Sequence, residues 1–233
     1  MKHIIVLIGF ILSSKSSEML ITTTKTYGLT GNVEYVSEKI EKVTLAKDWN
    51  YTIDTKEPYC FISNKYFNRN GVVDSVVYLN KDSILLSKVL YNYNNDDNKG
   101  IFSIQYNNIG KKIYENICVN QEDSIAYFKT INADNKDIES KSWTKIVNNK
   151  TVWQKSENVK SKLISEWIYK IDNNGQDIEI KTKNSFDKKQ NINIVKIKYI
   201  EYDKCGNWTK RIEFNDSDKN ASLVKTRLIK YYE

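Results

Sequence analysis

Five of the eight glycines in this chain share one sequence pattern, and that pattern constrains the fold more than any other feature. Each follows an Asp or Asn by three residues; the pairs are Asn68 and Gly71, Asp97 and Gly100, Asn107 and Gly110, Asp172 and Gly175, and Asp203 and Gly206. An Asx side chain accepts hydrogen bonds from the backbone of a turn, and Gly adopts the left-handed conformation that closes a bulged type I turn. These ten residues therefore predict the corners of β-hairpins.

The segments that follow the corners alternate apolar and polar residues, which is typical of half-buried strands. Residues 176–180 (QDIEI) and 207–214 (NWTKRIEF) show this alternation, and the 16 Tyr add to the strand preference. No long segment has the 3.6-residue period of an amphipathic helix. We predict a mainly β protein, an antiparallel meander of hairpin repeats that forms a curved or stacked sheet.

Weaker signals add detail to this prediction. Residues 32–44 are expected to form the first strand of the mature chain, and Gly28 and Gly31 an early turn. A degenerate sixth corner is expected at residues 132–135, with Asn135 in the left-handed position. A helical turn is expected within residues 156–162. The corners are unevenly spaced, which indicates eroded repeats and not a strict solenoid.

The N-terminus has the pattern of an export signal. Lys2 precedes an apolar run over residues 4–12, and serines follow it. The run is too short to span a bilayer, and a buried first strand is the alternative interpretation. We predict a signal peptide over residues 1–17 and one β-repeat domain over residues 18–233. The mature chain would be exported to the periplasm, the cell surface or the medium, with no transmembrane segment.

Charge and cysteine content leave several options open. The net charge of +7 falls to +5 without residues 1–17, because Lys2 and Lys15 are lost and no acid is. This mildly basic balance is typical of a Lys-rich surface; it is compatible with anionic partners, but no nucleic-acid motif accompanies it. Cys60, Cys118 and Cys205 permit one disulfide with a spare thiol, or none.

The sequence excludes several kinds of chemistry. Its one His is His3, inside the expected signal, so the mature chain lacks Ser-His-Asp machinery and the commonest zinc ligands. We predict no cofactor, no metal and no catalytic residue. Carboxylate chemistry, a Ser-Lys pair and calcium binding at residues 94–98 (NNDDN) remain open, with a solvated loop favoured over calcium. Trp and Tyr are expected to fill the packed face of the sheet, with an aromatic ligand platform as the alternative.

Residues 202–211 (YDKCGNWTKR) resemble the Tyr-Asp-x-x-Gly-Asn signature of YD-repeat, RHS-like proteins. They resemble more narrowly the repeats of small secreted proteins of Bacteroidetes type, whose opening Gly-x-Val-x-x-Val strand is similar to residues 31–36 (GNVEYV). The other corners lack the full Tyr-Asp pair. The resemblance implies a stacked or curved antiparallel sheet and implies no activity.

Two functions are compatible with these features. The first is a non-catalytic binding or scaffold module of the cell envelope, with a glycan, a peptide or an envelope protein as partner. The alternative is a carboxylate-dependent hydrolase that acts on an envelope or extracellular polymer. A pocket holding two or more buried acids would favour the hydrolase, and a flat aromatic face without such a pocket would favour the binding module.

Overall fold

The computed structural model describes residues 24–45, 49–53, 60–93, 100–122, 124–148, 150–186, 189–215 and 218–233. These residues form 15 β-strands: β1 Val33–Leu45, β2 Tyr51–Ile53, β3 Cys60–Phe67, β4 Val73–Asn80, β5 Leu85–Tyr91, β6 Gly100–Asn107, β7 Lys112–Glu122, β8 Ile125–Asn132, β9 Ile138–Val147, β10 Lys150–Asn158, β11 Ile164–Ile171, β12 Asp177–Phe186, β13 Lys189–Tyr202, β14 Trp208–Asn215 and β15 Asp218–Tyr231. Within the described ranges, no helix is long and apolar enough to cross a membrane. The expected signal over residues 1–17 lies outside them.

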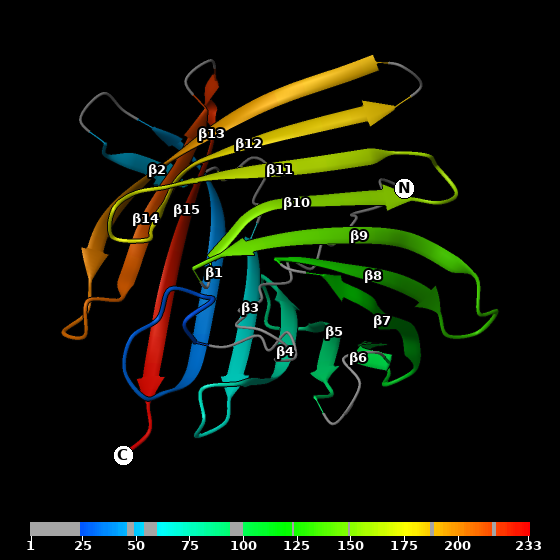
Figure 1. Ribbon diagram of the computed structural model, residues 1–233. Coiled ribbons are helices and arrows are strands. Elements are labelled where there is room, and N and C mark those ends of the chain that lie inside the picture. The colour runs from blue at the N-terminus through cyan, green and yellow to red at the C-terminus, as the bar shows by residue number, and fades with distance from the viewer. Residues whose placement is uncertain are drawn as a thin grey trace.

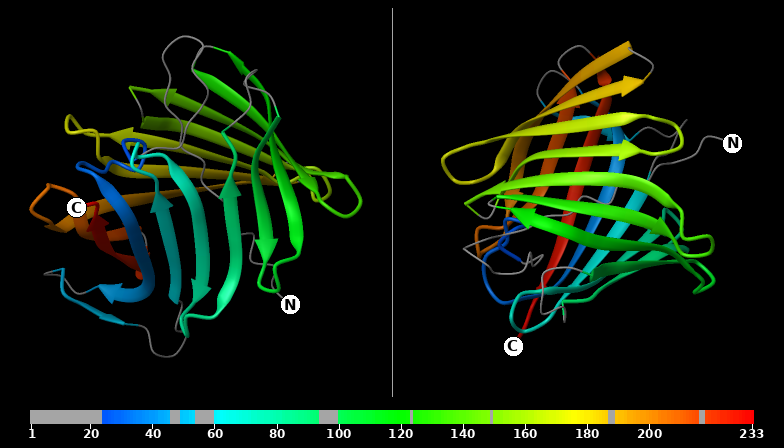
Figure 2. Two further views of the ribbon diagram at one scale, coloured as in Figure 1. Left: turned by 90° about the horizontal axis from the view of Figure 1, so that it is seen from below. Right: turned by 45° about the vertical axis from the view of Figure 1, so that its right-hand side comes forward.

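The strands form one antiparallel sheet in which neighbours along the chain pair from β3 to β15, and β3 pairs with β1 (Figure 1). The sheet then closes on itself. β1 pairs with β3 from Tyr35 to Glu41 and, along its other edge, with β15 from Val33 to Val43. Apart from short β2, which pairs only with the end of β1, the 14 remaining strands form a barrel. Figure 2 shows the sheet bending round until β15 lies beside β1.

The prediction of an antiparallel all-β meander is confirmed, and the prediction of an open curved or stacked sheet is wrong. An open sheet would leave one backbone edge of β1 and one of β15 unpaired. Closure pairs the two long edges with each other, through contacts such as Glu38 opposite Arg227. Those residues are 189 positions apart, so no local pattern in the sequence announces their pairing.

Four of the predicted corners share one geometry. Gly71, Gly110, Gly175 and Gly206 have φ angles of +74°, +77°, +76° and +79°. In each corner one side-chain oxygen of the Asx accepts backbone N–H bonds from the residues two and four positions later. At Asp203, for example, Oδ1 accepts from the amides of Cys205 and Asn207, both at 2.9 Å.

The fifth predicted corner is described only in part. Gly100 is the first residue of β6 and pairs with Cys118 of β7. Its predicted partner, Asp97, lies outside the described residues, as does the calcium loop considered at residues 94–98. The corner predicted at Asp97 and Gly100 therefore stays a prediction.

Three further corners have an Asx cap but no glycine, and only the one at Asn80 repeats the bonding to amides two and four positions later. Asn80 Oδ1 accepts from the amides of Asp82 and Ile84 at 2.9 Å each, and Ser83 takes the positive φ of 60°. At the sixth expected corner, Asn132 caps the turn, but Lys136 (φ 62°) and not Asn135 is left-handed. Residues 156–158 are strand, and the corner that follows has Asn158 as its cap and Lys162 at φ 58°. The Lys162 amide donates to the Asn158 carbonyl at 3.0 Å, so the expected helical turn is reduced to this single i to i+4 bond.

Apolar side chains fill the barrel in two clusters. One combines Phe102, Cys118, Ala126, Phe128 and Ile146 of β6 to β9. The other joins valines and aromatics of β1 and β3 to β5 with Leu29 and Tyr27 of the segment before β1. That segment is held at the barrel end: Thr24 donates its amide to the Gly71 carbonyl at 2.8 Å, and Thr30 bonds the Asn207 side chain at 2.6 Å.

A third apolar cluster lies on the outside of the barrel. Val43, Ile212 and Val224 are at most 1% exposed and pack with Leu45, Tyr51 and Phe214. Ile212 and Val224 alternate along their strands with charged residues, so the two kinds of side chain point to opposite faces of the sheet. Trp49, together with Tyr51 of β2, covers the apolar face, where the Trp49 and Phe214 rings lie 4.9 Å apart. The charged face is therefore the inner one.

Candidate functional site

Charged side chains from four strands gather inside the barrel. This luminal ion cluster consists of Glu38 of β1, Lys65 of β3, Arg211 and Glu213 of β14, and Lys225 and Arg227 of β15. None of the six exposes more than 16% of its side chain. The barrel closure builds the cluster, because it places β15 and β14 beside β1 and β3.

Each carboxylate of the cluster is shared by two cations. Glu38 accepts a hydrogen bond from Arg227 Nε at 2.8 Å and lies 3.9 Å from Lys65 Nζ. Glu213 Oε1 lies 2.5 Å from Arg211 Nη2 and 2.8 Å from Lys225 Nζ. Such pairing is what allows charges to remain in a buried position.

The pKa values reflect burial and pairing together. Burial alone would raise the pKa of Glu38, but Lys65 and Arg227 outweigh it and hold that pKa well below its ordinary value. The pKa of Glu213 is lowered in the same way, with Lys225 and Arg211 overcoming the effect of burial. Burial lowers the pKa of Lys65 to about 8. Both glutamates therefore stay ionised near neutral pH and are unsuited to act as general acids.

One indole lies against both arginines. The Cζ atom of Arg227 is 3.5 Å from the ring centroid of Trp208, and that of Arg211 is 4.5 Å from it. The Tyr199 ring lies 6.0 Å from the same centroid. The negative face of an aromatic ring stabilises a nearby guanidinium, so Trp208 offsets part of the cost of burying these cations.

Two more titratable groups, on β10 and β12, interact electrostatically with the cluster. Burial raises the pKa of Asp177 of β12 and lowers that of Lys150 of β10, and Arg227 of β15 acts on both of them. β10 and β15 are five places apart in the strand order, so this influence crosses the inside of the barrel. The barrel thus holds three buried acids and five buried cations near one another.

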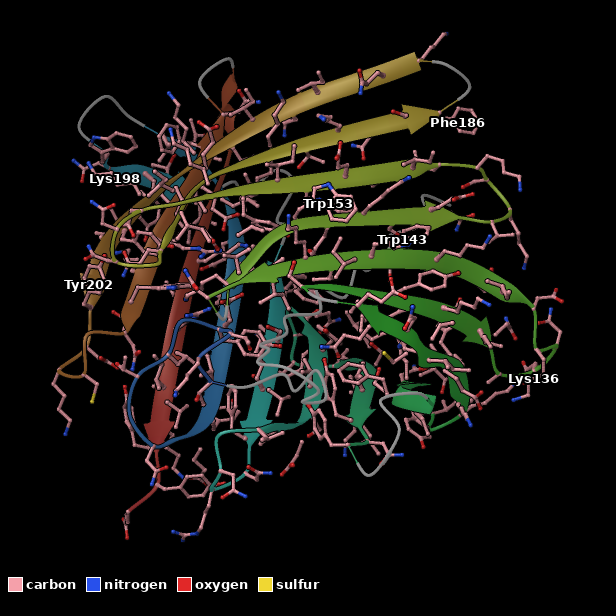
Figure 3. All side chains as sticks on the ribbon, in the orientation of Figure 1. Lys136, Trp143, Trp153, Phe186, Lys198 and Tyr202 are labelled. Carbon is pink, nitrogen blue, oxygen red and sulfur yellow. The ribbon has the colours of Figure 1, made fainter. Side chains whose placement is uncertain are left out.

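A second surface of interest lies outside the barrel on β8, β9 and β10. Ladder pairing arranges it in three cross-strand rows, which we call the outer aromatic face: Ile125, Lys145 and Trp153; Tyr127, Trp143 and Lys155; Lys129, Lys141 and Glu157. The residues between them along the strands, such as Phe128, Thr144 and Gln154, are buried on the inner side. Trp143 and Trp153 lie on neighbouring strands of this face (Figure 3).

The outer aromatic face combines stacked rings with lysines. The Tyr127 and Trp143 rings are stacked, with centroids 5.1 Å apart and an interplanar angle of 20°. Lys155 Nζ is 5.3 Å from the Trp143 centroid, and Lys129 Nζ is 5.9 Å from that of Tyr127. Four lysines and one glutamate give the nine residues a net charge of +3.

Of the predicted turn residues, those of the last corner do more than shape a hairpin. Asp203 also accepts a short hydrogen bond from the Tyr231 hydroxyl, and Asn207 Nδ2 donates to the Thr30 carbonyl at 2.9 Å. Burial disfavours the Asp203 anion, but the bonds from Tyr231, Asn207 and Cys205 lower its pKa overall. This corner therefore connects β14, the end of β15 and the segment before β1.

The cysteines and potential metal ligands form no further site in the described part of the chain. Cys118 is buried and Cys205 exposed, and both are free thiols. The Cys60 side chain lies outside the described residues. No three Cys, His, Asp or Glu side chains gather there in a way that could hold a metal ion.

The sequence did not point to the luminal ion cluster. One signal was present: the chain has only three arginines, and two of them, Arg211 and Arg227, stand on strands beside an apolar residue, next to Ile212 and close to Val224. Ordinary pattern rules assign the apolar face to the core and the charged face to solvent. Here Trp49 and β2 cover the apolar face from outside, so the charged face of these strands is the one that points into the barrel.

Comparison with known proteins identifies no family. No family model and no curated protein matches the chain. Two solved structures are similar over most of it: a porin-like protein from Bacteroides uniformis, at 9% identity over 85% of this chain and 98% of that one, with a TM-score of 0.30; and a LolA superfamily protein from Nitrosomonas europaea, at 11% identity over 88% of each chain, with a TM-score of 0.27. Scores this low carry no functional inference.

Proposed function

We propose that this chain is an exported, non-catalytic binding module of the cell envelope, and that its outer aromatic face binds an acidic polysaccharide. The observation that carries the proposal is the Tyr127–Trp143 stack with lysines at its rim. Aromatic faces stack on the apolar faces of sugar rings, and the net charge of +3 complements carboxylated sugars. The export step rests on the apolar run at residues 4–12 alone.

The pairing of the buried acids supports a binding role over hydrolysis. A glycosidase needs one carboxyl group kept protonated as an acid and a second one ionised, at a fixed separation. Glu38 and Glu213 are each held ionised between two cations. Among the described residues, the gathering of these two acids with Asp177, whose pKa is raised by burial, is what favours the hydrolase alternative.

Titration calorimetry with oligogalacturonate, a chain of uronic acids, tests the proposal. The Trp143→Ala variant should bind at least about tenfold more weakly, equivalent to about 1.4 kcal/mol. Phe186→Ala is the matched control, because Phe186 is 56% exposed and lies at the far end of β12 (Figure 3). Equal affinity of Trp143→Ala and the unsubstituted chain would contradict the proposal. Release of shortened fragments, abolished by Asp177→Asn, would establish the hydrolase instead.

A further inference from the structure

Two buried arginines of the luminal ion cluster carry N–H groups that no described protein atom accepts. They are Nε of Arg211 and Nη1 of Arg227. The two side chains are 11% and 7% exposed, so these donors are largely withdrawn from bulk solvent. A buried charged group with an unused donor is costly, and such groups in native proteins usually face a partner.

The cluster also has an excess of positive charge. Lys65, Arg211, Lys225 and Arg227 stand against Glu38 and Glu213, which gives a net charge of +2. Adding Asp177 of β12 and Lys150 of β10 leaves that excess unchanged, since they carry one charge of each sign. Both glutamates already serve two cations, so the excess is not neutralised by the acids of the cluster.

The two arginines that carry the unused donors lie close to each other, against the same indole ring. Both guanidinium groups lie against the Trp208 ring, at 3.5 and 4.5 Å, so their Cζ atoms are at most 8.0 Å apart. An oxyanion held between two planar guanidinium forks receives several charge-assisted hydrogen bonds at once. A dianion would match the excess of +2, which favours a phosphate group over a carboxylate.

We propose that the barrel interior binds a phosphate group between Arg211 and Arg227, beside Trp208. The site is separate from the outer aromatic face and is independent of the function proposed for that face. The phosphate is either free inorganic phosphate or the phosphate of a lipid headgroup, because the two guanidinium groups recognise the oxyanion itself.

Thermal unfolding and phosphorus NMR of the full chain test this proposal. Inorganic phosphate should raise the melting temperature in a saturable way at constant ionic strength, whereas chloride should not. Arg211→Lys and Arg227→Lys keep the positive charge and the pairing with a glutamate but remove the planar fork, and each should weaken binding by about tenfold or more. Submicellar dihexanoyl phosphatidic acid distinguishes the sources, since tighter binding of this lipid than of inorganic phosphate would identify a headgroup site.

Arg69→Lys is the matched control. Arg69 is the third arginine of the chain and also lies over an aromatic ring, 4.9 Å from Tyr232, but it sits at an exposed corner. Its affinity for phosphate should equal that of the unsubstituted chain. The proposal is overturned if phosphate and chloride stabilise the unsubstituted chain equally. That measurement does not depend on whether any variant folds. Equal weakening by Arg69→Lys would overturn the proposal as well.

Discussion

The last two Asx corners allow a quantitative test of the turn mechanism. A Cβ atom at Gly206 would meet no atom within 4 Å, and at Gly175 it would meet only Lys150 Cε at 3.4 Å, an ordinary contact. Substitution at either glycine is therefore opposed by the positive φ angle and not by crowding. Replacing Gly206 by Val should lower the free energy of unfolding by about 1 to 3 kcal/mol. Gly206→Asn should cost less, because Asn tolerates the left-handed region.

The capping side chains allow a second, independent estimate of how much a corner contributes to the free energy of unfolding. Asp172 accepts two backbone bonds, from Asn174 and Gln176 at 2.9 Å each. Asp203 accepts the equivalent two and one more from the Tyr231 hydroxyl. At roughly 1 kcal/mol for each net bond, Asp203→Ala should be more destabilising than Asp172→Ala by about 1 kcal/mol.

Urea unfolding of the variants, followed by circular dichroism, measures these differences. Val should be worse than Asn at both Gly175 and Gly206, because the cause is local to each corner. If Val and Asn were tolerated equally at both positions, backbone strain would not be the reason for glycine there. If Asp172→Ala were the more damaging Asp variant, the contribution of Tyr231 would be refuted.

Two further predictions concern the luminal ion cluster. Glu38→Gln leaves Lys65 and Arg227 without their carboxylate and should lower the free energy of unfolding by about 3 to 5 kcal/mol. Glu41→Gln breaks an outer pair with Lys39 and should lower it by less than about 1 kcal/mol. Similar losses for the two variants in urea unfolding would refute this difference. Because the pKa of Lys65 falls from 10.5 to about 8 on folding, the unfolded chain binds more protons above pH 8, and stability should rise from pH 8 to about 10. Above about pH 10, buried tyrosines with raised pKa values should make stability fall again. If a Lys65→Met variant showed the same rise in stability from pH 8 to about 10, Lys65 would not be its cause.

Much of the local structure could be predicted from the sequence because its cause is local. The Asx and Gly spacing identifies four corners, and alternation identifies the strands between them. The same rule missed the corner at Asn80, where Ser83 takes the left-handed conformation, and misplaced the one at Asn132. Residues without a branched Cβ, such as Ser83 and Lys136, also adopt this conformation in Asx-capped corners, so the glycine signal is incomplete.

The two candidate sites also differ in whether their cause is local in the sequence. Trp143 and Trp153 lie in a stretch that is rich in Lys in the sequence itself, and the ladder pairing of adjacent strands is enough to bring them together. Arg211, Arg227 and Glu38 could not be grouped, because their proximity depends on a contact between the first and last long strands. Nor could the sequence show which face of β14 lines the barrel interior, because the apolar side chain of Ile212 suggested that its own face is the inner one.

The sequence by itself determined where the chain turns, which segments are strands and which chemistries lack their residues, because turn conformation and side-chain alternation act over a few positions. Only the tertiary structure decided that β15 returns to β1, that the sheet closes, and that its charged face lies inside at this point. Those outcomes depend on edge pairing across 189 residues and on the outer cover around β2. They assemble the luminal ion cluster from strands that the sequence keeps far apart.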